Sequence, residues 1–164
     1  MFILAAARVE RPADVMRLRA ELRSLCAPRQ RRLHFRSESD IRRRRILSLL
    51  GTHPVQTSLY LCRPRGRATH ARGRTVEALV DDLLTKPKTR VVFESRAERD
   101  RDDRRIIYER LAASGGELES YEFMRAYEEP GLWVADAVAW AYGAGKDWRR
   151  RAEPLIEKTV DVAF

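Results

Sequence analysis

Short apolar runs alternate with amphipathic segments along most of this chain, and that alternation is the feature that most restricts its fold. Residues 2–10, 56–62 and 90–95 are short and rich in β-prone side chains, which is typical of strands. Between them, apolar side chains recur every three or four residues, as at Val15 and Leu18, and this spacing predicts helices that bury one face. Strands that alternate with helices predict an α/β domain with a packed sheet.

The other predicted strands are shorter or less regular. They cover residues 33–36, 118–127 and 159–164. An apolar helix is predicted over residues 132–142, after Pro130. The chain of 164 residues contains no internal repeat and no linker between domains, and its length suits one hydrophobic core. We therefore predict a single domain over residues 1–164.

Arginine dominates the charge of the chain. There are 33 Lys and Arg residues against 24 Asp and Glu, a formal net charge of +9, and only four of the 33 are lysines. A guanidinium binds phosphate through two parallel hydrogen bonds, so the excess indicates a polyanionic partner, and we expect nucleic acid. Codon bias in a GC-rich genome produces the same excess without any function. The composition alone leaves both explanations open.

Several classes of protein are excluded on sequence grounds. The two cysteines, Cys26 and Cys62, have no CxxC pair or histidine cluster with them, so we expect neither a disulfide scaffold nor a zinc site. The apolar residues 1–7 lack the basic segment with which a signal peptide begins. No stretch approaches the ~18 consecutive apolar residues of a membrane helix. We therefore expect a soluble, cytoplasmic protein without a membrane partner.

Asp136 is the most informative acidic residue in the sequence. It lies within the apolar segment 132–142, and its helical neighbours at three and four positions include Trp133 and Trp140. A carboxylate among apolar side chains is costly unless it is paired, hydrogen-bonded or bound to a cation. Two interpretations remain open, a functional acid and a buried ion pair with one of the many arginines.

Two further acids complete a hypothetical metal site. Glu94 lies near the end of the strand 90–95, at the edge where open α/β sheets bind ligands, although a polar residue leaving a strand is also ordinary. Glu38 lies at a predicted helix start, where the helix dipole alone favours acids. Mg²⁺ and Mn²⁺ prefer oxygen ligands, and carboxylates that share such ions assist phosphodiester cleavage. We predict that Glu94, Asp136 and Glu38 are the metal ligands and catalytic residues of such a site.

Clustered arginines are the predicted phosphate contacts. Four consecutive arginines on one helix cannot all face a core, so we expect most of them to project outward. Such groups bind phosphates with little sequence preference, although a run of charge is more often simply a solvated face. The predicted nucleic-acid contacts are Arg42, Arg43, Arg44, Arg45, Arg149 and Arg150, together with Arg63, Arg65, Arg67, Arg72 and Arg74 in a Gly- and Arg-rich connector.

The segments LHFRSES, VVFES and EEPGLWVADAVAWAYG, in this order, resemble an uncharacterised bacterial family of the ribonuclease H-like superfamily. The resemblance spans most of the chain, although its motifs are short. It implies a mixed sheet flanked by helices and hydrolysis of phosphodiesters with Mg²⁺ or Mn²⁺. It also implies that Asp136 is the acid of a late helix, Glu94 the acid at a strand end, and Glu38 an acid on the helix after the third strand.

Members of that family begin with an Asp-Glu-Ser-Gly strand, whereas residues 1–7 resemble the family's second strand. The resemblance therefore implies a ribonuclease H-like domain that lacks the first strand and its metal-binding Asp. Three functions remain open: a degenerate metal-dependent nuclease, a non-catalytic nucleic-acid-binding domain, and an interaction module of a defence or mobile-element system. In the third, a second copy or another chain would occupy the edge left by the missing strand.

Overall fold

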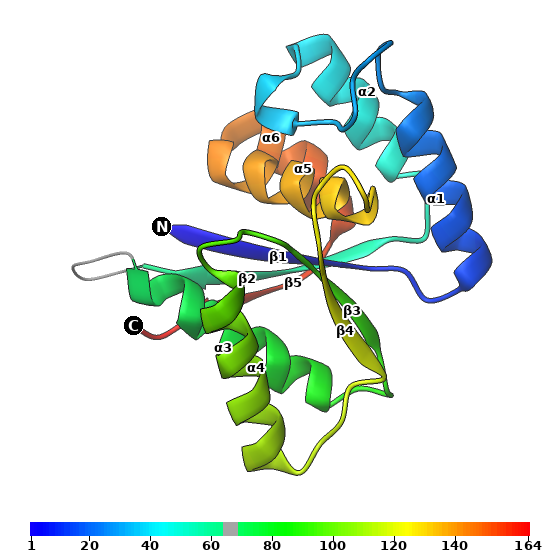
Figure 1. Cartoon of the computed structure of the whole chain (residues 1–164). Helices are drawn as coiled ribbons and strands as arrows, with labels where there is room; N and C mark the ends of the chain where they lie inside the picture. Colours follow the sequence, from blue (N-terminus) through cyan, green and yellow to red (C-terminus); the bar gives the residue numbers. More distant parts are fainter. Residues whose placement is uncertain (64–68) are drawn as a thin grey trace. The chain divides into compact units, whose positions relative to one another are not determined.

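The computed structural model describes residues 1–63 and 69–164, and it confirms the α/β class, with a mixed sheet and flanking helices (Figure 1). Two short 3-10 helices, η1 and η2, accompany the regular elements. In chain order the elements are β1 (Phe2–Arg8), α1 (Pro12–Ser24), η1 (Phe35–Ser37), α2 (Asp40–Leu50), β2 (Gln56–Cys62), α3 (Thr69–Leu84), β3 (Arg90–Glu94), α4 (Asp100–Ser114), β4 (Ser120–Met124), α5 (Gly131–Ala144), α6 (Lys146–Ala152), η2 (Glu153–Leu155) and β5 (Ile156–Val162).

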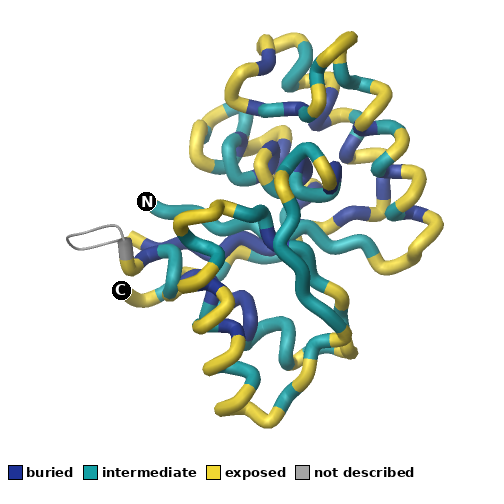
Figure 2. The backbone as a smooth tube through the Cα atoms, in the orientation of Figure 1, coloured by how far each residue is buried: buried dark blue, intermediate teal, exposed yellow. Residues whose placement is uncertain are grey.

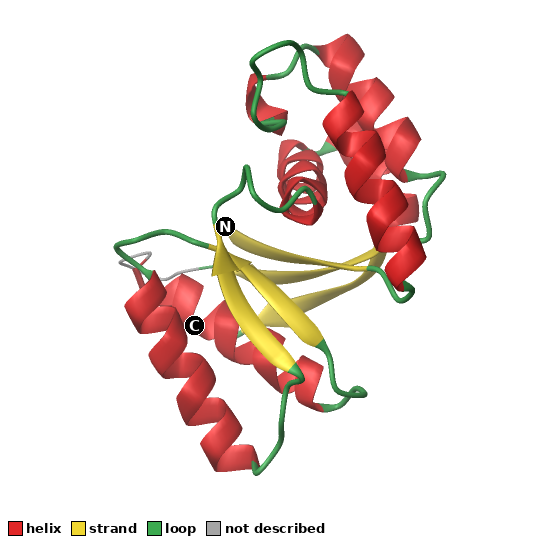
Figure 3. Cartoon of the chain, turned by 45° about the vertical axis from the view of Figure 1, so that its right-hand side comes forward, coloured by secondary structure: helices red, strands yellow, loops and turns green. Residues whose placement is uncertain are grey.

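The strands of the described residues form two hydrogen-bonded groups. One group has the order β1-β2-β5, and in the other β3 pairs with β4 (Figure 3). β3 and β4 run parallel, with Arg90 opposite Ser120 and Glu94 opposite Met124. The middle strand β2 is buried along all but its first residue, which agrees with the apolar run from Leu59 to Cys62 in its second half. β5 alternates between half-buried and exposed residues, as expected of an outer strand.

The chain divides into two compact units. The first contains residues 1–4, 60–125 and 160–164, and the second contains residues 5–59 and 126–159. Helices α3 and α4 and the β3–β4 pair belong to the first unit. Helices α1, α2, α5 and α6 belong to the second, where α6 packs on α5 and α2, and α1 packs on α5.

Helices α3 and α4 of the first unit pack around an ion pair. Asp103 of α4 is only 1 % exposed, and its carboxylate accepts hydrogen bonds from Arg72 of α3, the closest at 2.5 Å. A second pair, Arg110 with Asp81, joins the same two helices closer to the surface. The fully buried Val76 of α3 adds to the apolar contact that this packing provides.

Helix α5 supplies much of the core of the second unit (Figure 2). Its residues Trp133, Val134, Ala137 and Val138 are buried. Their spacing of one, three and four residues places them along one side of the helix, which is the pattern of a helix that packs by one face. The apolar helix predicted over residues 132–142 is therefore confirmed as a core element.

The strand predicted at residues 33–36 is wrong. Phe35 starts the 3-10 helix η1, and its ring is 1 % exposed and packs edge-on against Trp140, with 5.4 Å between the ring centroids. Side chains satisfy the backbone of Phe35: its N–H donates to Asp136 Oδ2, and its carbonyl accepts from Arg43 Nε at 2.9 Å. The Phe35 carbonyl also accepts from the Glu38 backbone N–H at 3.3 Å, so the backbone groups of Phe35 bond to side chains and within the η1 turn and not to a strand.

Two other predicted strands exist with different boundaries. The strand predicted at 118–127 covers only Ser120–Met124, and the one predicted at 159–164 is Ile156–Val162. The second begins earlier because η2, which contains Pro154, ends at Leu155 and the chain is extended from the next residue on.

Candidate functional site

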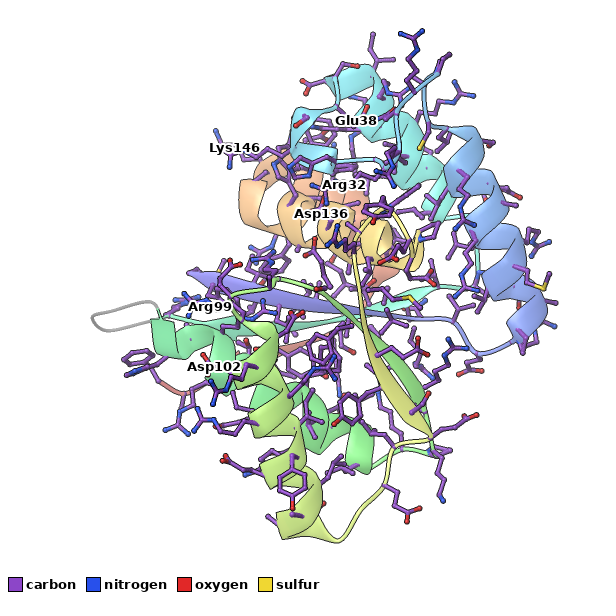
Figure 4. All side chains as sticks on the ribbon, in the orientation of Figure 1. Arg32, Glu38, Arg99, Asp102, Asp136 and Lys146 are labelled. Atoms are coloured by element: carbon purple, nitrogen blue, oxygen red, sulfur yellow. The ribbon has the colours of Figure 1, made fainter. Side chains whose placement is uncertain are left out.

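The three acids predicted as metal ligands lie in different elements. Glu94 is the last residue of β3, in the first unit. Glu38 comes just before α2, and Asp136 lies in the middle of α5, both in the second unit (Figure 4). Among residues 1–63 and 69–164, no three His, Cys, Asp or Glu side chains are grouped so that they could hold a metal ion. The surroundings of each acid show what it does in the fold.

Asp136 lies on the exposed side of α5, and the expectation of a buried carboxylate is wrong. Its side chain is 44 % exposed. The Oδ2 atom accepts a hydrogen bond from the backbone N–H of Phe35 at 3.1 Å and lies 3.4 Å from His34 Nδ1. The carboxylate therefore holds the backbone at the start of η1 against α5.

Glu38 is buried and paired within the second unit. Its side chain is 7 % exposed, and its two oxygens accept hydrogen bonds from Arg42 Nε at 2.5 Å and from Gln30 Nε2 at 2.8 Å. Burial opposes ionisation of this carboxyl, but the hydrogen bonds from Arg42 and Gln30 outweigh it and lower the pKa of Glu38. Both oxygens of Glu38 therefore already have partners within the fold, and its role as a metal ligand stays a prediction.

Glu94 ends β3 beside a polar turn. Its side chain is 38 % exposed, and its Oε2 accepts a hydrogen bond from Arg96 Nη2 at 3.2 Å. Asp100 begins α4 and accepts hydrogen bonds from the Ser95 hydroxyl at 2.6 Å and the Arg96 backbone N–H at 2.7 Å. The bond from Ser95 is the main cause of the lowered pKa of Asp100. In this turn, Asp100 serves to start a helix.

Two of the four consecutive arginines of α2 act inside the fold. Arg42 donates to Glu38 and to the backbone carbonyl of Leu25 at 2.8 Å. Arg43 is 15 % exposed and donates to the carbonyls of Phe35 and Arg36. Its guanidinium also lies 4.3 Å from the ring centroid of Trp140. Arg42 and Arg43 therefore tie α2 to its neighbours, and only Arg44 and Arg45 project outward as expected.

The predicted arginines of α6 also divide into two kinds. Arg150 pairs with Asp147, which Arg151 also contacts at 2.6 Å, and the hydrogen bond from Arg151 is the largest cause of the lowered pKa of Asp147. Arg149 has no acidic partner among the described residues, and its guanidinium lies 3.7 Å from the centroid of the Tyr142 ring.

Among the described residues, the predicted connector supplies few unpaired arginines that could contact phosphates. Arg72 and Arg74 belong to α3 and pair with Asp103 and Glu77. Arg63 is exposed, and Arg65 and Arg67 lie outside the described residues.

Several exposed cations of the second unit have no acidic partner among the described residues, and we name the five of them that lie on η1, α2 and α6 the basic surface. Arg43 connects their elements, because it bonds to the backbone of Arg36 and contacts α6 through Trp148, 5.9 Å away. Figure 4 shows Lys146 projecting outward at the start of α6. This lysine has a left-handed backbone with φ of 47°, next to Gly145 at 71°. The basic surface consists of Arg36, Arg44, Arg45, Lys146 and Arg149.

Sequence reasoning missed part of this surface. Arg36 and Lys146 are single cations outside any run, so charge clustering could not find them. The aromatic signal was present: Trp140 and Trp148 are the rings on which Arg43 and Arg44 lie, with 5.6 Å between Arg44 and the Trp148 centroid. Because these rings belong to α5 and α6 and the arginines to α2, the sequence does not show which arginine each ring contacts.

A hollow of about 240 Å³ in the second unit contains none of the predicted site residues. Its charged side chains pair with acids of the same unit: Arg8 pairs with Glu10 and Glu157, and Arg11 pairs with the buried Asp14. The hollow therefore presents little uncompensated charge. Its lining residues are Arg8, Glu10, Arg11, Asp14, Pro54 and Gln56.

The comparisons with known proteins assign no family to this chain. No protein-family model, no curated protein and no solved structure matches the chain. In residues 1–63 and 69–164, no helix has the length and apolar character needed to cross a bilayer.

Proposed function

We propose that this chain binds nucleic acid through the basic surface of its second unit. The observation that carries the proposal is the absence of acidic partners: Arg44, Arg149 and the other three cations have none in the described part of the chain, although the sequence contains 24 Asp and Glu. Some exposed arginines outside this surface, such as Arg90 and Arg96, do pair with acids. The surface therefore carries charge that the fold itself does not neutralise.

Grouped like charges repel one another, and a polyanion removes that repulsion. When a cationic side chain neutralises a phosphate, the counterions condensed on the nucleic acid are released, and binding then weakens steeply as salt is added. Arg44 and Arg149 lie on the outer sides of helices and contact no buried polar group that would select a base. Contacts of this kind position a protein on the phosphate backbone with little sequence preference.

For the finer architecture, we propose a ribonuclease H-like fold. Three features support it. The parallel strands β3 and β4 are joined through helix α4, the connection that parallel strands require. An acid, Glu94, ends β3, and a second acid, Asp136, lies exposed on the late helix α5. In this architecture a metal-dependent nuclease is the competing function, and the environment of Glu38 argues against it.

Salt titration of binding tests the proposed function. A fluorescent DNA duplex is titrated with wild-type protein, with Arg44→Gln/Arg149→Gln, and with the control Arg101→Gln/Arg105→Gln, which removes the same charge from exposed arginines of α4. We expect the first pair to weaken binding and to lower the slope of log affinity against log salt by about 1.8, since each duplex phosphate contact contributes about 0.9. Equal losses in both pairs, or no salt-dependent binding by the wild type, would overturn the proposal.

A cleavage assay separates binding alone from the nuclease. Single- and double-stranded RNA and DNA are incubated with the wild type in Mg²⁺, in Mn²⁺ and in EDTA, and the assay is repeated with Asp136→Asn. Binding without cleavage supports the proposed function. Cleavage that disappears with EDTA and with the substitution would instead establish the nuclease.

A further inference from the structure

In three exposed arginines of the second unit, the guanidinium carbon lies over an aromatic ring. The distances from guanidinium carbon to ring centroid are 3.7 Å for Arg149 on Tyr142, 3.9 Å for Arg31 on Tyr127, and 5.6 Å for Arg44 on Trp148. The three rings are half-buried, so each is held by the fold. We name these three pairs the outer stacks.

The outer stacks differ from the interior stack of Arg43. The Arg43 guanidinium lies on Trp140 and donates to the Phe35 and Arg36 carbonyls, so its hydrogen-bonding groups are used within the fold. None of the outer arginines donates to a side chain or carbonyl within the described residues. Their N–H groups remain available to a ligand.

A guanidinium in an outer stack has two different faces. One side lies toward the protein's ring, and the other is open to solvent because the arginine is exposed. The guanidinium is planar and weakly hydrated, so its free face accepts another flat π-system at small desolvation cost. Unpaired nucleobases stack in this way on aromatic side chains and on arginine planes, whereas the bases of a duplex already stack on one another.

We propose that the outer stacks select single-stranded nucleic acid, with unpaired bases stacking on the free faces of Arg31, Arg44 and Arg149. This inference rests on the proposed function and specifies the class of nucleic acid bound there. The arginines then act in two ways, through their charge on phosphates and through their planes on bases. A lysine in the same place retains the charge and lacks the plane.

The experiment uses two single strands with the same number of phosphates. One is a thymidine strand of about 16 nucleotides, a length within the range of known single-strand sites, and the other is an abasic strand of equal length. The full chain is titrated with each strand as wild type and as Arg31→Lys/Arg44→Lys/Arg149→Lys. The control is Arg101→Lys/Arg105→Lys, which makes the same change on exposed arginines of α4 that contact no aromatic ring among the described residues.

We expect the wild type and the α4 control to bind the thymidine strand about ten-fold more tightly than the abasic strand, since base stacking contributes at least this much at comparable sites. The outer-stack variant should bind both strands equally, with its salt dependence unchanged. Equal affinity of the wild type for the two strands, or an outer-stack variant that behaves as the wild type, would overturn this inference and leave the proposed function intact. If the wild type binds neither strand nor duplex, the proposed function itself fails.

Discussion

The two units each enclose an arginine between helices, and they neutralise it in different ways. In the first unit, Arg72 of α3 meets the carboxylate of Asp103, an acid with 1 % exposure. In the second, Arg43 of α2 meets the Phe35 and Arg36 carbonyls and the face of Trp140. One site places two opposite charges in the interior, and the other spreads a single charge over dipoles and a π-system.

This difference has a consequence for the surface. Asp103 balances Arg72 completely, so the α3–α4 contact adds no net charge to the first unit. Arg43 is satisfied with only one acid beside it, the exposed Asp40 at 2.7 Å. The second site therefore keeps its acid at the surface and not in the interior. The excess of positive charge on the second unit comes from exposed cations without an acid among the described residues, such as Arg44 and Arg149.

The largest effect is expected where the opposite charges are buried. Asp103→Asn leaves the guanidinium of Arg72 buried without its counter-ion, and we expect a loss of about 3–5 kcal/mol in the free energy of unfolding, measured by urea titration with circular dichroism. The control Arg72→Met/Asp103→Leu removes both charges and should recover most of that loss. A loss below about 1 kcal/mol for Asp103→Asn would mean that the pair is not buried as described.

A smaller loss is expected at the interior arginine of the second unit. Arg43→Met keeps most of the apolar stem but removes the hydrogen bonds to Phe35 and Arg36 and the contact with Trp140, at an expected cost of about 2 kcal/mol. Tryptophan fluorescence is the suitable probe, because all three tryptophans belong to the second unit. Arg43→Lys should recover little of the stability that Arg43→Met loses, since one ammonium cannot reproduce the planar guanidinium fork. Full stability of Arg43→Met would show that the stacking alone has no structural role.

Asp136 should contribute less to the free energy of unfolding than Arg43 does. Asp136→Ala removes the acceptor for the Phe35 N–H and should cost about 1 kcal/mol in urea unfolding. Asp136→Asn keeps an oxygen that can accept this bond, and its stability should stay within about 0.5 kcal/mol of the wild type. If Asp136→Asn is as unstable as Asp136→Ala, the charge beside His34, and not the hydrogen bond, is what matters.

The smallest effect is a dependence on pH. The folded pKa of Glu38 is lowered, so its contribution to stability is complete above its unfolded pKa of about 4.3 and is lost as the pH falls through the folded value. The difference in unfolding free energy between the wild type and Glu38→Gln should therefore be constant near neutral pH and shrink in acid. A difference that grows in acid would contradict the pairing of Glu38 with Arg42.

Much of the fold is predictable because it depends on apolar periodicity. α5 and β2 bury apolar residues in the patterns of a helix and a covered strand, and both were predicted. The conformation of residues 33–36 was not predicted correctly. No local pattern shows that Asp136, about a hundred positions away, will accept a hydrogen bond from the N–H of Phe35. An interaction so distant in sequence leaves no trace in a short window.

The candidate site was predicted only in part. The exposure of Asp136 was missed because a helix rich in apolar residues still has an outer side, and the sequence does not show where that side lies. The division of the arginine run has a local explanation. Arg43 precedes the buried Ile46 and Leu47 by three and four residues, so it shares their face. Whether Glu94 and Asp136 act in catalysis stays a prediction.

The turn between α5 and α6 has an evolutionary consequence. Lys146 holds a left-handed backbone that disfavours most side chains by roughly 1–2 kcal/mol and that glycine adopts freely. Under random drift, glycine or asparagine would be favoured at this position, and only a use for the ammonium group opposes that replacement. Residue 146 in descendants of this gene should therefore record whether selection has preserved the surface: lysine where it is in use, and glycine where it has been abandoned.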